Sequence, residues 1–351
     1  MGDQEWVHVN SRRRRNPALA LLALAIGLAL SAPPVLAASS AGPSSTEPVT
    51  VTVPMRTITT PGTSGLNGIL EIRVGSSAPF LVMLDTGSVG LRVFPGAWGS
   101  RPDHVRITST PIITSSAGSS MKGFVAKAPI TIGGVTTTHS VGFQLVNTDS
   151  PYIKKWAADH VYGILGVGTG RYALSNPLSA LPGSTGLRWS IHFGGDPATG
   201  RQGSGSLVLG AEPAADADAT FDLPPMGPDG NGALLWDDHQ APGCWTFGHE
   251  PQHCVDTWFD SGFTVTRVKG AVFNKVPHES GAVRTGTDIT LAESGSAAAT
   301  WQFPAGSTAS VNLVRLEPEG RAQINTGNAL YFQYTFTYDV ERGLISLSRS
   351  S

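Results

Sequence analysis

Two short segments constrain most strongly how this chain can fold. Residues 81–88 read Leu-Val-Met-Leu-Asp-Thr-Gly-Ser, and residues 257–264 read Thr-Trp-Phe-Asp-Ser-Gly-Phe-Thr. In each segment an apolar, strand-like run ends in an aspartate, which a hydroxyl residue and a glycine follow. Burial of a carboxylate is costly unless the group is hydrogen-bonded or shares a proton. Asp85 and Asp260 therefore predict a paired site to which each half of the chain contributes one carboxylate.

Either segment alone also fits an ordinary strand and turn, in which Asp and Gly serve the turn geometry. Three further segments favour the paired site: a glycine-punctuated apolar run at 162–168, a strand pair within 193–210, and Asn-Thr-Gly followed by aromatic strand residues at 325–339. With these segments in this order, residues 53–346 resemble the pepsin-like aspartic proteases. The resemblance implies an all-β, bilobal fold with the active-site cleft between the lobes.

The resemblance also assigns roles to residues of this sequence. Asp85 and Asp260 would be catalytic, the hydroxyls of Thr86 and Ser261 would each bond to the opposite loop, and Ser88 would donate to the outer oxygen of Asp85. The complete set of supporting residues is Thr86, Gly87, Ser88, Ser261, Gly262 and Thr264. Gly87 and Gly262 would allow backbone amides to approach the carboxylates.

The predicted chemistry is general acid–base catalysis. Two nearby carboxyl groups cannot both ionise cheaply, so the pair holds one proton over a range of pH. The ionised member accepts a proton from water, and the protonated member donates to the substrate carbonyl. This chemistry needs no cofactor and no metal.

Three positions depart from the family's pattern. The flap, matched to residues 116–124, has Ser116 where the family has a tyrosine, and Arg92 stands where a tryptophan is expected. Phe263 replaces a small hydroxyl residue, so we expect Asp260 to be held less symmetrically than Asp85. The flap residues expected to contact substrate are Ser119, Ser120, Met121 and Gly123. The pattern is similar to that of a bacterial subfamily, the aspartic protease domains of mycobacterial surface proteins.

Composition and patterning predict the organisation of the chain. With 42 Gly, 25 Pro and 14% charged residues in 351 positions, short strands and turns are favoured over long helices. We expect a half-buried strand at 66–74 and one short helix at 176–181. The predicted domains are a signal peptide at 1–37, a Ser/Pro/Thr-rich linker at 38–52, an N-terminal lobe at 53–187, and interlobe strands with a C-terminal lobe at 188–351.

The signal peptide is predicted from four arginines at 12–15, an apolar run at 18–30 and small residues before position 38. The run is short for a bilayer span, which needs about 20 residues, although an uncleaved anchor is the alternative. Cleavage would leave a protein that is secreted or held in the cell envelope, without stable membrane insertion.

The two cysteines, Cys244 and Cys254, have two interpretations. In an exported protein they predict one disulfide, and the family resembled here similarly has a small disulfide loop before the second aspartate. Metal binding is the alternative because His249 and His253 lie between them, although a paired Cys-x-x-Cys zinc spacing is missing.

The net charge and the motifs limit the classes of partner that we expect. The net charge is −2 and there is no basic stripe, so nucleic acid is not an expected partner. Gly-x-Ser-x-Gly is absent from the sequence, and His-Glu-x-x-His occurs once, at 249–253, within the cysteine segment described above. We expect a monomer that acts on proteins or peptides as an endopeptidase. The alternative is a catalytically weak or inactive binding or inhibitor protein at the cell surface.

Overall fold

The computed structural model describes residues 49–63, 65–116, 118–296, 298–306 and 312–350. The predicted signal peptide lies outside this range, and so does the predicted linker as far as residue 48. Residues Pro48–Ser351 form one compact unit. The first strand begins at Val51, two residues before the predicted start of the N-terminal lobe.

The larger of two main sheets runs through both predicted lobes. Among the described residues it has 15 strands. Its main path, in order of hydrogen-bonded neighbours, is β15 (Ala219–Asp222), β28 (Leu344–Arg349), β27 (Tyr334–Asp339), β11 (Arg188–His192), β14 (Ser204–Leu209), β1 (Val51–Thr59), β2 (Leu66–Val74), β3 (Phe80–Asp85), β10 (Val161–Val167), β4 (Val89–Val93), β9 (Val141–Val146), β6 (Ser119–Ala128) and β5 (Arg106–Ser116). The short strands β7 (Ile130–Ile132) and β8 (Val135–Thr136) extend from β2.

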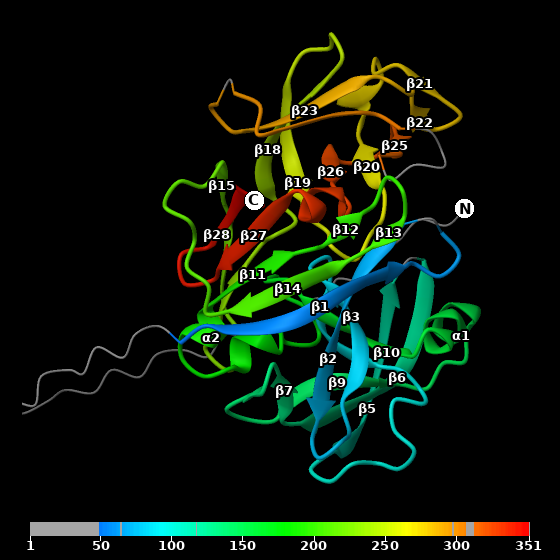
Figure 1. Cartoon of the computed structure of the whole chain (residues 1–351), viewed down its shortest axis with the longest axis vertical. Coiled ribbons are helices and arrows are strands. Elements are labelled where there is room, and N and C mark those ends of the chain that lie inside the picture. Colours follow the sequence, from blue (N-terminus) through cyan, green and yellow to red (C-terminus); the bar gives the residue numbers. More distant parts are fainter. Residues whose placement is uncertain (1–48, 64, 117, 297, 307–311, 351) are drawn as a thin grey trace, which may run out of the picture. The chain divides into compact units, whose positions relative to one another are not determined.

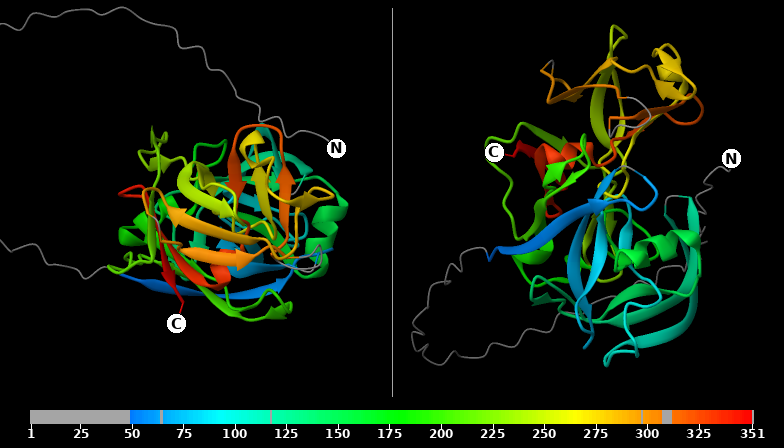
Figure 2. Two further views of the ribbon diagram at one scale, coloured as in Figure 1. Left: turned by 90° about the horizontal axis from the view of Figure 1, so that it is seen from above. Right: turned by 45° about the vertical axis from the view of Figure 1, so that its right-hand side comes forward.

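The second main sheet has nine strands in the described part of the chain. Their order is β21 (His278–Glu279), β22 (Ala282–Val283), β25 (Val314–Glu317), β20 (Thr266–Lys269), β26 (Gln323–Asn325), β19 (His253–Trp258), β18 (Ala241–Phe247), β23 (Asp288–Glu293) and β24 (Trp301–Pro304). Figures 1 and 2 show strands of this sheet, in yellow and orange, at one end of the unit, with β1, β11 and β14 between them and the strands around β3.

Helices and isolated hairpins are minor components. The described helices are α1 (Pro151–Ala158), α2 (Ser184–Leu187) and the 3-10 turns η1 (Leu178–Ala180), η2 (Ala271–Phe273) and η3 (Ala329–Phe332). Two hairpins stand apart from the main sheets: β12 (Gly195–Asp196) with β13 (Arg201–Gln202), and β16 (Pro225–Pro228) with β17 (Leu234–Trp236). No described helix has the length and apolarity needed to span a membrane. The helix expected at 176–181 is reduced to the three residues of η1.

The two aspartate segments have the same local topology. β3 enters the first loop and β4 leaves it, and β10 lies between them, parallel to β3 and antiparallel to β4. In the second sheet β26 lies in the same way between β19 and β20. The glycine-punctuated apolar run noted at 162–168 is therefore mostly β10 and lies beside the first loop. A Cβ on Gly166 would lie 2.7 Å from the carbonyl oxygen of Gly90, so a residue without a side chain is needed at this position.

The strand expected at 66–74 forms over that range as β2, but it is more buried than its alternation predicts. Glu71 and Arg73 are exposed, as expected. Residues 66–70 are buried on both faces of the strand, including the polar Asn67. The reason becomes clear at the site, because this end of β2 contacts the second aspartate loop.

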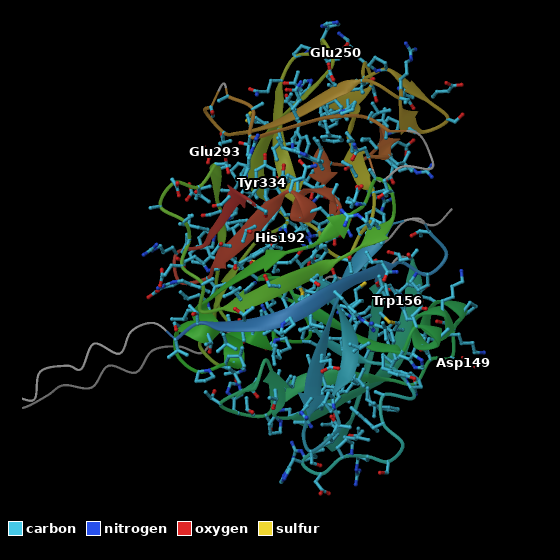
Figure 3. All side chains as sticks on the ribbon, in the orientation of Figure 1. Asp149, Trp156, His192, Glu250, Glu293 and Tyr334 are labelled. Atoms are coloured by element: carbon cyan, nitrogen blue, oxygen red, sulfur yellow. A yellow bond between two sulfur atoms is a disulfide. The ribbon has the colours of Figure 1, made fainter. Side chains whose placement is uncertain are left out.

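Two apolar clusters hold the strands together. The larger draws side chains from both main sheets, and the smaller lies beneath α1, where Ile153 and Trp156 pack with Met83 and Met121. In Figure 3 the smaller cluster is marked by Trp156 beside α1, and the larger one by Tyr334 of β27. A buried aliphatic or aromatic side chain contributes about 1.5–3 kcal/mol, so these clusters supply much of the stability that holds the two aspartate loops together.

The cysteines form a disulfide, as predicted. Cys244 and Cys254 are direct partners in the β18–β19 ladder, and their sulfur atoms are bonded. The bridge braces the strand that leads to Asp260. The thiols are therefore not available to a metal, and in the described residues no group of three or more His, Cys, Asp or Glu side chains is arranged to hold one.

Candidate active site

The two predicted aspartates come together at the ends of corresponding strands. Asp85 ends β3, and Asp260 follows β19 by two positions. Each is only 6% exposed, and the charge of Asp85 acts on Asp260. A Cβ on Gly87 would lie 2.3 Å from Asp260 Oδ1, and one on Gly262 would lie 2.3 Å from Asp85 Oδ1. Each loop therefore packs its glycine against the opposite carboxyl group.

The hydrogen bonds expected between the loops are present. The Thr86 amide donates to Ser261 Oγ (2.9 Å), and the Ser261 amide donates to Thr86 Oγ1 (2.8 Å). Each hydroxyl then donates to a main-chain oxygen of the other loop: Thr86 to Phe259 (2.7 Å) and Ser261 to Leu84 (3.3 Å). Because both residues are buried, this reciprocal set holds the two carboxyl groups in a fixed relation.

Each carboxyl group has a donor at both oxygens. Asp85 accepts from the Gly87 amide (2.8 Å) and from Ser88 Oγ (2.5 Å). Asp260 accepts from the Gly262 amide (2.9 Å) at Oδ1 and from Asn325 Nδ2 (2.7 Å) at Oδ2.

The expectation that Asp260 is held less symmetrically than Asp85 is therefore wrong in one respect. Phe263 has no side-chain donor, but Asn325 at the end of β26 supplies one from another segment. In the sequence, Asn-Thr-Gly at 325–327 predicts only the approach to the aromatic strand residues that follow it. An amide residue directly before Thr-Gly, the same two residues that follow Asp85, was the available signal for this role.

Burial raises the pKa of both carboxyl groups. For Asp85, the Ser88 hydrogen bond and the nearby Arg92 charge oppose this effect. For Asp260, the charge of Asp85 adds to burial and raises the pKa to about 7, while the Asn325 hydrogen bond opposes it. A close buried pair with these shifts holds one proton over the range between its two ionisations.

Three buried polar residues that the sequence analysis missed support the loops. Asn67 of β2 donates from Nδ2 to the carbonyl of Gly262 (3.2 Å). Asn328 donates from Nδ2 to the carbonyl of Leu66 (2.6 Å). Tyr331 Oη lies 3.0 Å from Thr86 Oγ1. An asparagine within the apolar run 66–70 was a signal that could have identified Asn67.

The predicted flap residues divide into two groups. The hairpin of β5 and β6 forms, with Ser116 opposite Ser119 at its end, and Ser120 is exposed. In contrast to the prediction, Met121 is completely buried in the smaller apolar cluster. A Cβ on Gly123 would lie 2.1 Å from the carbonyl oxygen of Leu145. Gly123 therefore permits close packing of β9 and does not present a surface to substrate.

Two other expectations change at this end of the site. The tyrosine missing at Ser116 has a counterpart in space, because Tyr152 Oη of α1 lies 3.1 Å from Ser116 Oγ. Thr264, predicted as a supporting residue, makes no hydrogen bond to either carboxyl group among the described residues. It packs against the first lobe, where a Cβ on Gly65 would lie 2.5 Å from Thr264 Cβ.

Comparison with solved structures shows what this arrangement is similar to. The aspartic proteinase from Irpex lacteus matches with a TM-score of 0.59 and 17% sequence identity, over 86% of this chain and 98% of that one. No family model matches the sequence, and no curated protein matches it either. The chain has the all-β, bilobal fold of pepsin-like aspartic proteinases. At this identity the likeness concerns the fold, and the chemistry must be argued from the residues.

Proposed function

We propose that this chain is an aspartic endopeptidase that activates a water molecule between Asp85 and Asp260. The observation that carries the proposal is the buried carboxyl pair, in which each loop's glycine packs against the other loop's carboxyl group. An ordinary turn aspartate is exposed and needs no such partner. A buried pair that shares a proton is costly to stability and supplies a base and an acid at one point.

The proposed reaction balances its protons within the pair. The ionised carboxylate takes a proton from water as the water oxygen attacks the substrate carbonyl carbon, and the protonated carboxyl gives its proton to the carbonyl oxygen. The resulting diol then loses a hydroxyl proton to the second carboxylate. The first carboxyl protonates the nitrogen, and the carbon–nitrogen bond breaks. No covalent intermediate with the protein forms.

The substrate in this proposal is an extended protein or peptide segment. It would bind as an added strand against the β5–β6 hairpin, with main-chain hydrogen bonds providing affinity. Ser119 and Ser120 at the start of β6 are the predicted flap residues that remain candidates for this contact.

We further propose that the protein is exported, as a monomer of the bacterial subfamily named above. The disulfide supports an oxidising compartment, and the predicted signal peptide accords with it. The acidic net charge supports protein substrates over nucleic acid. N-terminal sequencing of the protein recovered outside the producing cells tests the export proposal, which predicts a new terminus near residue 38.

The test of function is cleavage of a proteome-derived peptide library from pH 3 to 7, followed by mass spectrometry. Asp85→Asn should abolish cleavage, and Asp222→Asn, which changes an exposed aspartate on β15, should not. Pepstatin reports whether the site accepts a general inhibitor of such pairs. A folded protein without any cleavage would favour the alternative, a binding or inhibitor protein on the same scaffold.

A further inference from the structure

Arg92 is a buried cation beside the carboxyl pair. It lies on β4, four residues after Ser88, and is only 6% exposed. Charged side chains are almost never buried without a partner, because their desolvation is costly. Among the described residues, however, no carboxylate lies within 4.0 Å of its guanidinium. Its charge acts on the carboxyl group of Asp85, and the Ser88 hydroxyl is hydrogen-bonded to both side chains.

One hydrogen bond of Arg92 leads to Asp85 through the Ser88 hydroxyl. Arg92 Nη1 donates to Ser88 Oγ (3.0 Å) and to the Gly90 carbonyl (3.2 Å). A guanidinium has donors and no acceptor, so Ser88 Oγ must accept from it. The hydroxyl hydrogen is then left for Asp85 Oδ2, 2.5 Å away, which is its acceptor in the described part of the chain. This chain of donors favours an unprotonated Oδ2.

A second set of contacts fixes the guanidinium itself. Arg92 Nε donates to Thr114 Oγ1 of β5 (3.2 Å), and that hydroxyl donates to Gln144 Oε1 (2.6 Å). Gln144 is fully buried, and its Nε2 donates to the Met121 carbonyl oxygen (2.9 Å). The guanidinium is therefore held between the flap hairpin and the first aspartate loop, and it is not free to turn away from Ser88.

Within the part of the chain that the structure describes, no cation acts in this way on the second carboxyl group. Asp260 Oδ2 accepts from the neutral amide of Asn325. The other titratable groups that act on the pair are phenols. Tyr152 and Tyr172 interact with Asp85, and Tyr331 and Tyr338 interact with Asp260. Burial raises the pKa of all four phenols above the usual value near 10, so all four are neutral below pH 10. Asp238 and Asp237 also act on Tyr172. The electrostatic difference between the two halves of the pair therefore comes from Arg92.

We propose that Arg92 is a positioning residue that acts through the Ser88 hydroxyl, fixing Asp85 as the ionised carboxylate of the pair and leaving the shared proton on Asp260. In the reaction proposed above, on which this inference rests for its role, Asp85 takes the proton from water and Asp260 protonates the substrate carbonyl. The charge assignment itself is a property of the free protein and is measurable without substrate.

The first test is therefore a carboxyl ¹³C NMR titration of the whole protein, labelled at aspartate Cγ. The signals are assigned by their loss in Asp85→Asn and Asp260→Asn. We expect the Asp85 signal to move mainly in the more acidic step and the Asp260 signal in the later one. In Arg92→Met the Asp85 step should move up by about one pH unit or more, whereas Arg92→Lys, which keeps a cation, should preserve the order. Asp85 titrating in the later step of the unmodified protein would overturn the proposal.

The second test is the pH profile of kcat/KM. Loss of the cation raises the pKa of Asp85, so the acidic limb in Arg92→Met should move to higher pH by about the same amount. Arg73→Met, which removes an exposed arginine on β2, is the control and should leave the limb in place. A uniform fall in kcat/KM with an unmoved limb would mean that Arg92 is merely structural. If Arg92→Met does not fold, Ser88→Ala breaks the same chain and should produce the same shift.

The two tests distinguish a failure of the proposed function from a failure of the role proposed for Arg92. If no variant and not even the unmodified protein cleaves peptide, the proposed function fails, and the NMR titration still decides the charge assignment. If cleavage occurs but the two carboxyl groups titrate in the opposite order, only the role of Arg92 is overturned.

Discussion

The two aspartate loops share a backbone plan and differ in the donors around it. Each has a strand entering, a strand leaving and a third strand between them. In each, the inner carboxyl oxygen (Oδ1) accepts from the amide of the loop glycine. The outer oxygens differ. Asp85 has a hydroxyl three residues along its own loop, with a cation behind it, and Asp260 has an amide from a strand 65 positions away.

This comparison shows how a nearly symmetric scaffold can hold two chemically different carboxyl groups. The shared features (inner amides, crossed hydroxyls and facing glycines) place the groups. The features that differ set which one keeps the proton. Activity should therefore be equally sensitive to damage in the shared features of either loop, and unequally sensitive to changes in the outer donors.

The largest effect is expected from the facing glycines. Gly87→Ala and Gly262→Ala each place a methyl group 2.3 Å from the opposite carboxyl oxygen, so the pair must move apart. A misplacement of about 1 Å costs on the order of 100-fold in rate, and both variants should lose at least this much kcat/KM. Gly99→Ala, whose Cβ meets nothing within 4 Å, is the control. A large loss of kcat/KM in only one of the two variants would contradict the view that both loops position the pair equally.

A smaller effect is expected from the outer donor of the second loop. Asn325→Leu removes the hydrogen bond to Asp260 Oδ2, and because Asp260 carries the shared proton, the bond is one between neutral groups and is worth about 0.5–1.5 kcal/mol. We expect kcat/KM to fall roughly 2- to 10-fold, with the alkaline limb moving to higher pH because the bond lowers the pKa of Asp260. Adding Phe263→Ser should recover part of the rate. Unchanged activity in Asn325→Leu would show that the second loop needs no outer donor.

The smallest effect is expected on stability. Because folding raises the pKa of Asp260 from 3.8 to about 7, its burial costs little at pH 4, where it is protonated in the folded protein. The cost grows as pH rises from about 4 toward 7. Asp260→Asn should therefore increase the free energy of unfolding at pH 7 by about 1–3 kcal/mol and change it little at pH 4. Thermal unfolding at the two pH values measures this, and an equal gain at both would contradict the pKa shift.

Local patterns in the sequence were sufficient for the elements and for much of the site. Apolar runs that end in Asp-Thr-Gly and Asp-Ser-Gly identified the strands and the turns, because a buried run followed by a small residue has few other solutions. The crossed hydrogen bonds of Thr86 and Ser261 were expected from the resemblance. Met121 was misplaced because the register of a strand decides which side chains face the core, and a one-residue change reverses it.

What the sequence by itself determined is the two aspartate loops with their glycines, the disulfide and the all-β character, because each shows in a pattern of residues close together in the chain. The pairing of the two aspartates was expected from the resemblance. Only the tertiary structure decided which groups complete the site. Asn325, Asn67 and Tyr152 reach it from other strands and from a helix, and Arg92 becomes a buried cation only when β5 and β9 close over it. Contacts between segments far apart in the chain leave no periodic signal, and the environment of a charge exists only after folding has removed water from it.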